Sequence, residues 1–200
     1  MADNSIYNGF ASMANYSTEY NQLLFVIKQN LSMLQTSIPV QVVNVYPNTQ
    51  FAGFVDIQPL VQQITANGDS IDHGVLSNVP YLRVQGGSNA IIIDPVIGDI
   101  GIAVFSSRDI SGVKNSRKKS PPSSMRSYDF SDGMYIGGIL NGTPTQFIEF
   151  TSTGINITTP GTVHINGNLS VSGTITNGAV NLTTHVHSDP QGGDVGGPHN

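Results

Sequence analysis

The chain has 200 residues, enough for one ordinary domain or two small ones, and its net charge of −5 argues against nucleic acid and anionic membranes as general partners. Only 10% of the residues are charged, against roughly 25% in ordinary soluble domains. The absence of cysteine excludes disulfides and thiolate metal sites, and 22 glycines with 11 prolines divide the chain into short elements.

The first predicted element is a helix within an N-terminal segment, residues 1–37, whose beginning is expected to be an arm. Ser17 or Thr18 is the expected N-cap, and Pro39 prevents the helix from continuing. The apolar face can pack on its own domain or form a seam with a neighbouring subunit. Its members share helical spacing and are Tyr20, Leu23, Leu24, Ile27, Leu31 and Leu34.

Residues 38–127 are predicted to form a small β domain that ends in a basic loop. The short strands are expected at 39–45, 54–57, 81–84, 90–93 and 100–105. Five strands in so short a segment favour a small closed barrel, because closure removes exposed edges.

Two acidic residues and a basic loop lie in this segment. Asp94 and Asp99 flank the connection before the last strand, and we expect aspartates there to cap a turn. The region 108–127 is predicted to be a loop, either a solvated surface or a contact for an acidic partner. Its residues 114–126 hold five of the eight basic residues, namely Lys114, Arg117, Lys118, Lys119 and Arg126.

Residues 128–184 are predicted to form a needle of very short strands. No Asp, Glu, Lys or Arg occurs between 150 and 188, and pairs such as Ile155/Ile157 recur between turns rich in Gly and Asn. Each strand buries few side chains, and no charge protects its edges, so one copy of this segment is not expected to be stable alone. Winding several chains into an intertwined β-helix or β-prism solves both problems.

The histidine pair at 185 and 187 is the sharpest chemical motif. In a strand, His185 and His187 point the same way, so both imidazoles can address one ion. Three chains around a threefold axis would supply six nitrogens, which suits an octahedral first-row metal better than zinc. A turn at 183–184 is required to bring both rings to the inner face. The pair can also be ordinary surface histidines, and residues 188–200 either a frayed tail or a compact tip.

The sequence contains no recognisable enzyme motif. It lacks the nucleophile elbow, the phosphate-binding glycine loop and the His-Glu-x-x-His pattern. We therefore expect a protein that is not an enzyme and has no small-molecule substrate.

Taken together, these parts resemble the central baseplate spike of contractile-tail bacteriophages, of the short baseplate assembly protein V type. The matching motifs are residues 94–101 (DPVIGDIG) and, more specifically, residues 184–193 (THVHSDPQGG). The resemblance covers about residues 38–200 and leaves 1–37 unmatched, a candidate for docking onto the tail hub.

The resemblance implies a homotrimer with three parts: an OB-fold domain, a β-helical needle and an apex at 185–200. It also implies one iron ion per trimer, bound by His185 and His187 of all three chains. The expected location is the tail tip of the virion, where the spike contacts tail hub and baseplate proteins and pierces the host envelope on sheath contraction. Two alternatives stay open: a nucleic-acid-binding OB-fold protein that uses the basic loop, and a carbohydrate-binding tail fibre.

Overall fold

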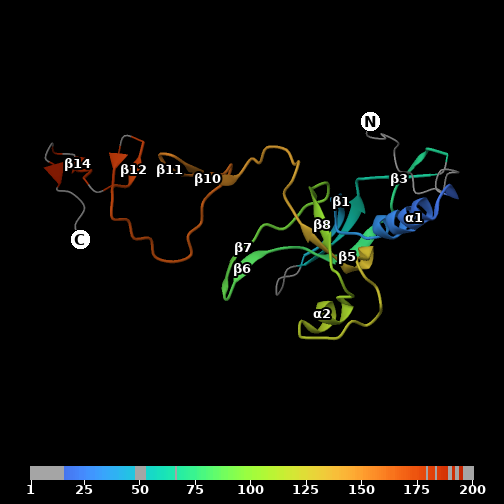
Figure 1. Cartoon of the computed structure of the whole chain (residues 1–200). Helices are drawn as coiled ribbons and strands as arrows, with labels where there is room; N and C mark the ends of the chain where they lie inside the picture. The colour runs from blue at the N-terminus through green and yellow to red at the C-terminus, as the bar shows by residue number, and fades with distance from the viewer. Residues whose placement is uncertain are drawn as a thin grey trace. The chain divides into compact units, whose positions relative to one another are not determined.

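The computed structural model describes residues 16–47, 53–65, 67–178, 180–182, 184–188, 191 and 194–195, with the backbone alone at 187–188 and 194–195. It divides into two compact units, Met1–Gly142 and Thr143–Asn200 (Figure 1). The described part is mainly β, and none of its helices has the length and apolar character that a membrane span needs.

The N-terminal helix, α1 (Glu19–Ser32), confirms the predicted element and its cap. The Thr18 hydroxyl accepts a hydrogen bond of 3.1 Å from the backbone N–H of Asn21, and the helix ends at its C-cap, Met33. None of its side chains is buried. The predicted apolar face therefore does not pack into a core formed by the described part of its own chain.

Five antiparallel strands form the main sheet of the first unit. They are β1 (Ser37–Tyr46), β2 (Phe54–Pro59), β5 (Leu76–Pro80), β8 (Ile100–Phe105) and β9 (Gly133–Ile136), in the order β5-β2-β1-β8-β9. The long central strand β1 pairs with β2 through its second half and with β8 through its first half, and a register shift lies between Val42 and Asn44. Such an irregularity bends a strand, and the sheet curls.

The curl brings the two edge strands near each other. Tyr81, just after β5, forms a parallel bridge with Tyr135 of β9, and the N–H of Leu82 donates to the Tyr135 carbonyl at 2.9 Å. The result is a half-barrel whose edges meet at this bridge. The predicted barrel-like β domain is thus confirmed in its coarse form, although the sheet is not the fully paired closed barrel that was expected.

The concave side of the half-barrel holds the core. Alternate residues of β2 and β8 are buried, as the period of a strand requires. Gly101 makes room for the Tyr135 ring, because a Cβ at this position would lie 2.5 Å from Cε2 of that ring. The buried apolar residues are Val40, Val42, Val55, Ile57, Val79, Tyr81, Ala103, Phe105 and Tyr135.

Two of the five expected barrel strands are wrong. Of these residues, Tyr81 forms the edge bridge of the half-barrel, whereas Val84 and 90–91 belong to an exposed hairpin, β6 (Val84–Gly86) with β7 (Asn89–Ile91), outside the main sheet. The missed third strand is β5. Its sequence does not alternate between apolar and polar residues as a typical strand does. It also has a positive φ at Asn78 and a proline at its end. The missed fifth strand is β9, in the segment expected to belong to the needle.

The remaining elements of this unit are short. A second hairpin joins β3 (Gln63–Ile64) and β4 (Ser70–Ile71). The expected loop at 108–127 contains the helix α2 (Ser111–Ser116), and the 3-10 helix η2 (Phe130–Asp132) precedes β9.

The described residues of the second unit form three separate two-stranded pairs, each antiparallel. They are β10 (Phe147–Thr151) with β11 (Gly154–Thr158), β12 (Thr176–Asn177) with β13 (Val180–Asn181), and β14 (His187–Ser188) with β15 (Asp194–Val195). Residues 159–175 are described and contain no strand in the single chain.

Candidate functional site

The hairpin β10–β11 presents a fully apolar face to solvent. Ile148 pairs with Ile157, and Phe150 pairs with Ile155, so these four side chains share one face. They are between 60% and 78% exposed. The other face carries mostly polar residues, such as Glu149 and Asn156. The predicted division of these strands into an apolar and a polar face is therefore present, but the apolar face has no cover within the described chain.

The same exposure continues along the second unit. None of its described side chains between 143 and 186 is buried. The exposed apolar side chains beyond the hairpin are Val163, Ile165, Leu169, Val171, Ile175, Val180, Leu182 and Val186. An isolated two-stranded hairpin is marginally stable in water, and large exposed apolar patches usually mark interaction surfaces. This unit therefore needs apolar surface from outside its own described residues.

The first histidine of the pair lies beyond a turn. The N–H of His185 donates to the Asn181 carbonyl at 2.9 Å, and the N–H of Thr184 donates to the same oxygen at 3.3 Å. A turn thus separates His185 from the preceding strand, as the sequence required for both rings to address one ion.

The ring of His185 is held in a way that fits a metal ligand. Its Nδ1 lies 3.1 Å from the Leu182 carbonyl, and a metal-bound histidine commonly donates its second ring N–H to such an oxygen. A ligand role for His185 would then fall to Nε2, and it stays a prediction. In the described part of the chain no three His, Asp or Glu side chains gather around one point. One chain was expected to supply only two ligands, so the metal stays a prediction.

The second histidine lies at the start of a short hairpin. His187 pairs with Val195, and Ser188 pairs with Asp194, so the backbone turns back on itself after the histidine pair. Most of 188–200, expected to be either a frayed tail or a compact tip, lies outside the described residues. The side chain of His187 lies outside the described residues.

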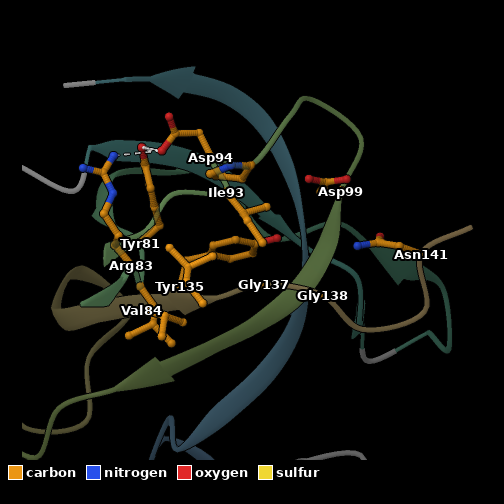
Figure 2. Close-up of a pocket in the computed structure, with 13 residues that line it drawn as sticks. Tyr81, Arg83, Val84, Ile93, Asp94, Asp99, Tyr135, Gly137, Gly138 and Asn141 are labelled. Atoms are coloured by element: carbon orange, nitrogen blue, oxygen red, sulfur yellow. Dashed lines mark hydrogen bonds and ion pairs between the residues drawn. The ribbon is translucent and has the colours of Figure 1, made fainter. Parts of the chain in front are cut away.

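A cavity of about 310 Å³ lies beside the bridge between the sheet edges (Figure 2). The Tyr81 hydroxyl donates to Asp94 at 2.7 Å, and Arg83 forms an ion pair with the same carboxylate at 3.0 Å. These hydrogen bonds, with that from Tyr81 the stronger influence, hold the pKa of Asp94 below its usual range. Burial raises the pKa of Tyr135 to about 12.

The two aspartates near this cavity have different roles. Asp99 accepts a hydrogen bond of 2.9 Å from the N–H of Val96 and caps the turn, as predicted. Asp94 instead binds Tyr81 and Arg83, next to the edge bridge. The prediction of a turn cap was therefore wrong for Asp94, because its partners are distant in sequence.

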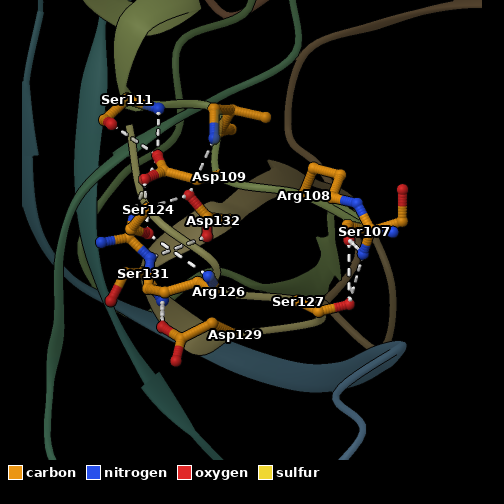
Figure 3. A network of polar contacts seen from close by, with 11 residues as sticks. Ser107, Arg108, Asp109, Ser111, Ser124, Arg126, Ser127, Asp129, Ser131 and Asp132 are labelled. Atoms are coloured by element: carbon orange, nitrogen blue, oxygen red, sulfur yellow. Dashed lines mark hydrogen bonds and ion pairs between the residues drawn. The ribbon is translucent and has the colours of Figure 1, made fainter. Parts of the chain in front are cut away.

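The expected basic loop is partly an internal ion-pair network (Figure 3). Arg126 lies 2.9 Å from Asp109 and 3.1 Å from Asp132, and both carboxylate side chains are only 1% exposed. Hydrogen bonds from the hydroxyls of Ser111 and Ser124 lower the pKa of Asp109.

Arg126, whose side chain is 36% exposed, therefore serves the fold of this unit through two buried carboxylates. Lys114 is also partly buried, and this burial lowers its pKa. Of the basic residues of this loop, those left as a candidate contact surface are Arg117, Lys118 and Lys119, which are exposed. Sequence reasoning missed the ion-pair network because Asp109 and Asp132 lie 17 and six residues from Arg126 along the chain.

Comparison with known proteins places this fold among phage proteins. The family model of the phage protein Gp138 N-terminal domain matches residues 38–138, which include all but the first residue of the five-stranded sheet. No curated protein matches the chain. The matched family agrees with the expected phage origin at its coarse level, and it suggests a structural component of the virion. Because this family model matches half of the chain, the chain belongs to the family of phage proteins with a Gp138 N-terminal domain.

Proposed function

We propose that the chain forms the homotrimeric central spike at the tip of a contractile phage tail, which pierces the host envelope when the sheath contracts. The observation that carries this proposal is the apolar face of β10–β11 and the exposed apolar residues that follow it. Membership of a phage protein family supports the setting in the virion.

Copies of the same chain are the best partners for this unit. From 150 to 188 there is no charged side chain, so three identical segments can approach one axis without repeating a like charge. Strands from neighbouring copies would also pair the open edges of each hairpin. A needle of this kind is stiff along its axis, because backbone hydrogen bonds and apolar packing cross between chains along its length.

The half-barrel serves as the platform that connects the needle to the tail. Its strand order, with antiparallel neighbours and a parallel contact between the edges at Tyr81 and Tyr135, is consistent with the OB-fold, a five-stranded and partly open barrel. Arg117, Lys118 and Lys119 are candidates for contacts with hub or baseplate proteins.

A metal at the apex would clamp the three chains together. His185 and His187 of each copy would hold one iron ion through six imidazole nitrogens, and the contact of His185 Nδ1 with the Leu182 carbonyl suits this role. The ion supplies a rigid cross-link. Metal binding requires the neutral imidazole and therefore competes with protons for these nitrogens.

Native mass and elemental analysis of one sample test this proposal. The sample is the full chain, purified without chelator and without a metal-affinity step. The expected result is a mass of three chains with one iron ion per trimer. A monomer at micromolar concentration would contradict the spike itself, whereas a trimer without metal, or with one ion per chain, would contradict only the proposed apex.

A further inference from the structure

The helix α1 carries an apolar stripe that the described chain leaves largely uncovered. Tyr20, Ile27 and Leu31 are 72%, 46% and 59% exposed. Leu34, just beyond the C-cap, extends the stripe and is 42% exposed, while Leu24 is half-buried. The half-buried residues Asn21, Phe25 and Gln29 follow one another at intervals of four and lie on a different side of the helix.

The spacing of this stripe is that of a coiled coil. From Tyr20 to Leu34 its members are separated by four, three, four and three residues, the alternation of the d and a positions of a heptad. Leu24 and Leu31 then occupy a positions, and Ile27 occupies a d position. Leucine at a with isoleucine at d favours three or four strands over two. We propose that the three α1 helices of the trimer pack in parallel around the threefold axis through this stripe.

The charge of the helix favours a second copy over another partner. A symmetric bundle repeats every charge three times, so a face that meets its own copies has to be nearly free of charge. The only charged residues of α1 are Glu19 and Lys28, and neither belongs to the stripe. A face that met a charged hub protein would instead be expected to carry complementary charges.

The stripe is short, which limits how much it can stabilise a trimer. Fourteen residues provide two heptads, and isolated helices shorter than about 12–15 residues are marginal in water. Such a bundle cannot hold three chains together alone, so this inference rests on the proposed trimer.

The short link after the helix is tied to the sheet. The N–H of Gln35 donates to the Tyr128 carbonyl, and the N–H of Phe105 donates to the Thr36 carbonyl, both at 3.0 Å. A trimer that brings three sheets around one axis would therefore also bring the ends of the three helices toward it.

Cysteine cross-linking tests the bundle directly, because the natural chain contains no cysteine. Ile27→Cys places a thiol in the stripe of the full-length protein, and Gln22→Cys places one on the opposite, exposed side of the same helix. Axes of packed helices lie about 8–10 Å apart, so thiols facing the seam can reach the short separation that a disulfide needs. We expect Ile27→Cys to form covalent dimers several-fold more efficiently than Gln22→Cys, independently of protein concentration.

A charge in the stripe supplies the second variant. In the Ile27→Cys background, Leu31→Lys should lower the yield of covalent dimer several-fold, because it brings three lysines together. Gln22→Lys in the same background should leave the yield unchanged. The native mass should stay that of a trimer in every case.

The outcomes separate this inference from the proposed function. A trimer in which Ile27→Cys cross-links no better than Gln22→Cys, or in which Leu31→Lys has no effect, would overturn the bundle and leave the spike standing. The stripe would then be assigned to another protein. A monomer would overturn both.

Discussion

The sheet of the first unit and the hairpin of the second unit use the same residue pattern with opposite results. In β2 and β8, every second residue is buried. In β10 and β11, apolar residues alternate in the same way, yet every position is exposed. The difference is that the first sheet curls over its own apolar side, whereas a two-stranded hairpin has nothing within its described unit to fold over. An alternating pattern therefore specifies which side is to be buried, and not which molecule buries it.

The two units also differ in their use of charge. The first unit buries Asp109 and Asp132 and compensates them with Arg126. The second unit has no charged side chain from 150 to 187. A buried charge needs a specific partner in a defined geometry, which suits a self-contained fold. A surface without charge suits contact with identical copies.

Removal of the second unit should have the largest effect. A chain that ends at Gly142 retains all five strands of the half-barrel, so we expect it to stay folded, with cooperative thermal unfolding. It should lose the trimer and sediment as a monomer, because the apolar surface of the needle is gone. A fully stable trimer of this truncated chain would show that the half-barrel or α1, and not the needle, holds the chains together.

Matched isoleucine-to-alanine substitutions distinguish apolar residues of the half-barrel core from those of the second unit. Ile57 is fully buried in the core, and Ile57→Ala should lower the free energy of unfolding of the half-barrel by about 2–5 kcal/mol. Ile157 is 60% exposed in the single chain, and Ile157→Ala should leave the half-barrel unchanged but weaken the trimer. Calorimetry of the first transition, together with trimer dissociation on dilution, measures both effects. If both variants changed half-barrel unfolding and trimer dissociation equally, the two units would not differ in how they bury apolar residues.

The ion-pair network should contribute to the stability of the first unit alone. Arg126→Ala leaves the buried Asp132 without its counter-charge, so the melting temperature of the half-barrel should fall by several degrees. Arg108→Ala is the matched control, because Arg108 binds the Ser107 carbonyl and the Ser127 hydroxyl rather than a buried carboxylate. An equal loss in both variants would show that the charge of Arg126 is not the cause.

The pH dependence of the half-barrel follows from Asp109. Hydrogen bonds from Ser111 and Ser124 lower its pKa in the folded state below the ordinary value of 3.8. The stabilisation is therefore complete above this value and is lost as the pH falls below it. Asp109→Asn should flatten the decline of the melting temperature in this acidic range, and an unchanged decline would assign acid sensitivity to other carboxylates.

Loss of the histidines should affect the tip and not the assembly. The double change His185→Ala and His187→Ala should remove the iron measured by elemental analysis and leave the native mass at three chains, since the needle strands precede the pair. Dissociation into monomers would mean that the metal, rather than the apolar needle, holds the trimer.

The smallest structural effect is expected at the exposed basic residues. Lys118→Glu with Lys119→Glu should change neither the melting temperature nor the trimer, because both side chains are exposed. If they contact the baseplate, incorporation of the spike into tails should decrease. Wild-type binding to oligonucleotides that depends on salt and is lost in this variant would instead support a nucleic-acid-binding domain.

Patterns of local spacing determined much of this protein from sequence alone. The helix and its Thr18 cap, the strands at 39–45, 54–57 and 100–105, and the apolar and polar faces of the β10–β11 hairpin all follow from neighbours a few residues apart. The turn before His185 was also required by local spacing, because side chains of a strand alternate between its two faces. Each of these features depends on backbone periodicity, which the order of residues specifies directly.

Only the tertiary structure decided which strands complete the half-barrel and what the charged residues do. The run 90–93 reads as a core strand but forms part of an exposed hairpin, while β5 and β9, with weaker patterns, supply the edges. Arg126 reads as part of a basic loop but forms ion pairs with two buried carboxylates, and Asp94 binds Tyr81 and Arg83 rather than capping a turn. Pairing at a sheet edge and compensation of a buried charge depend on residues brought together by the fold, and no local period encodes them.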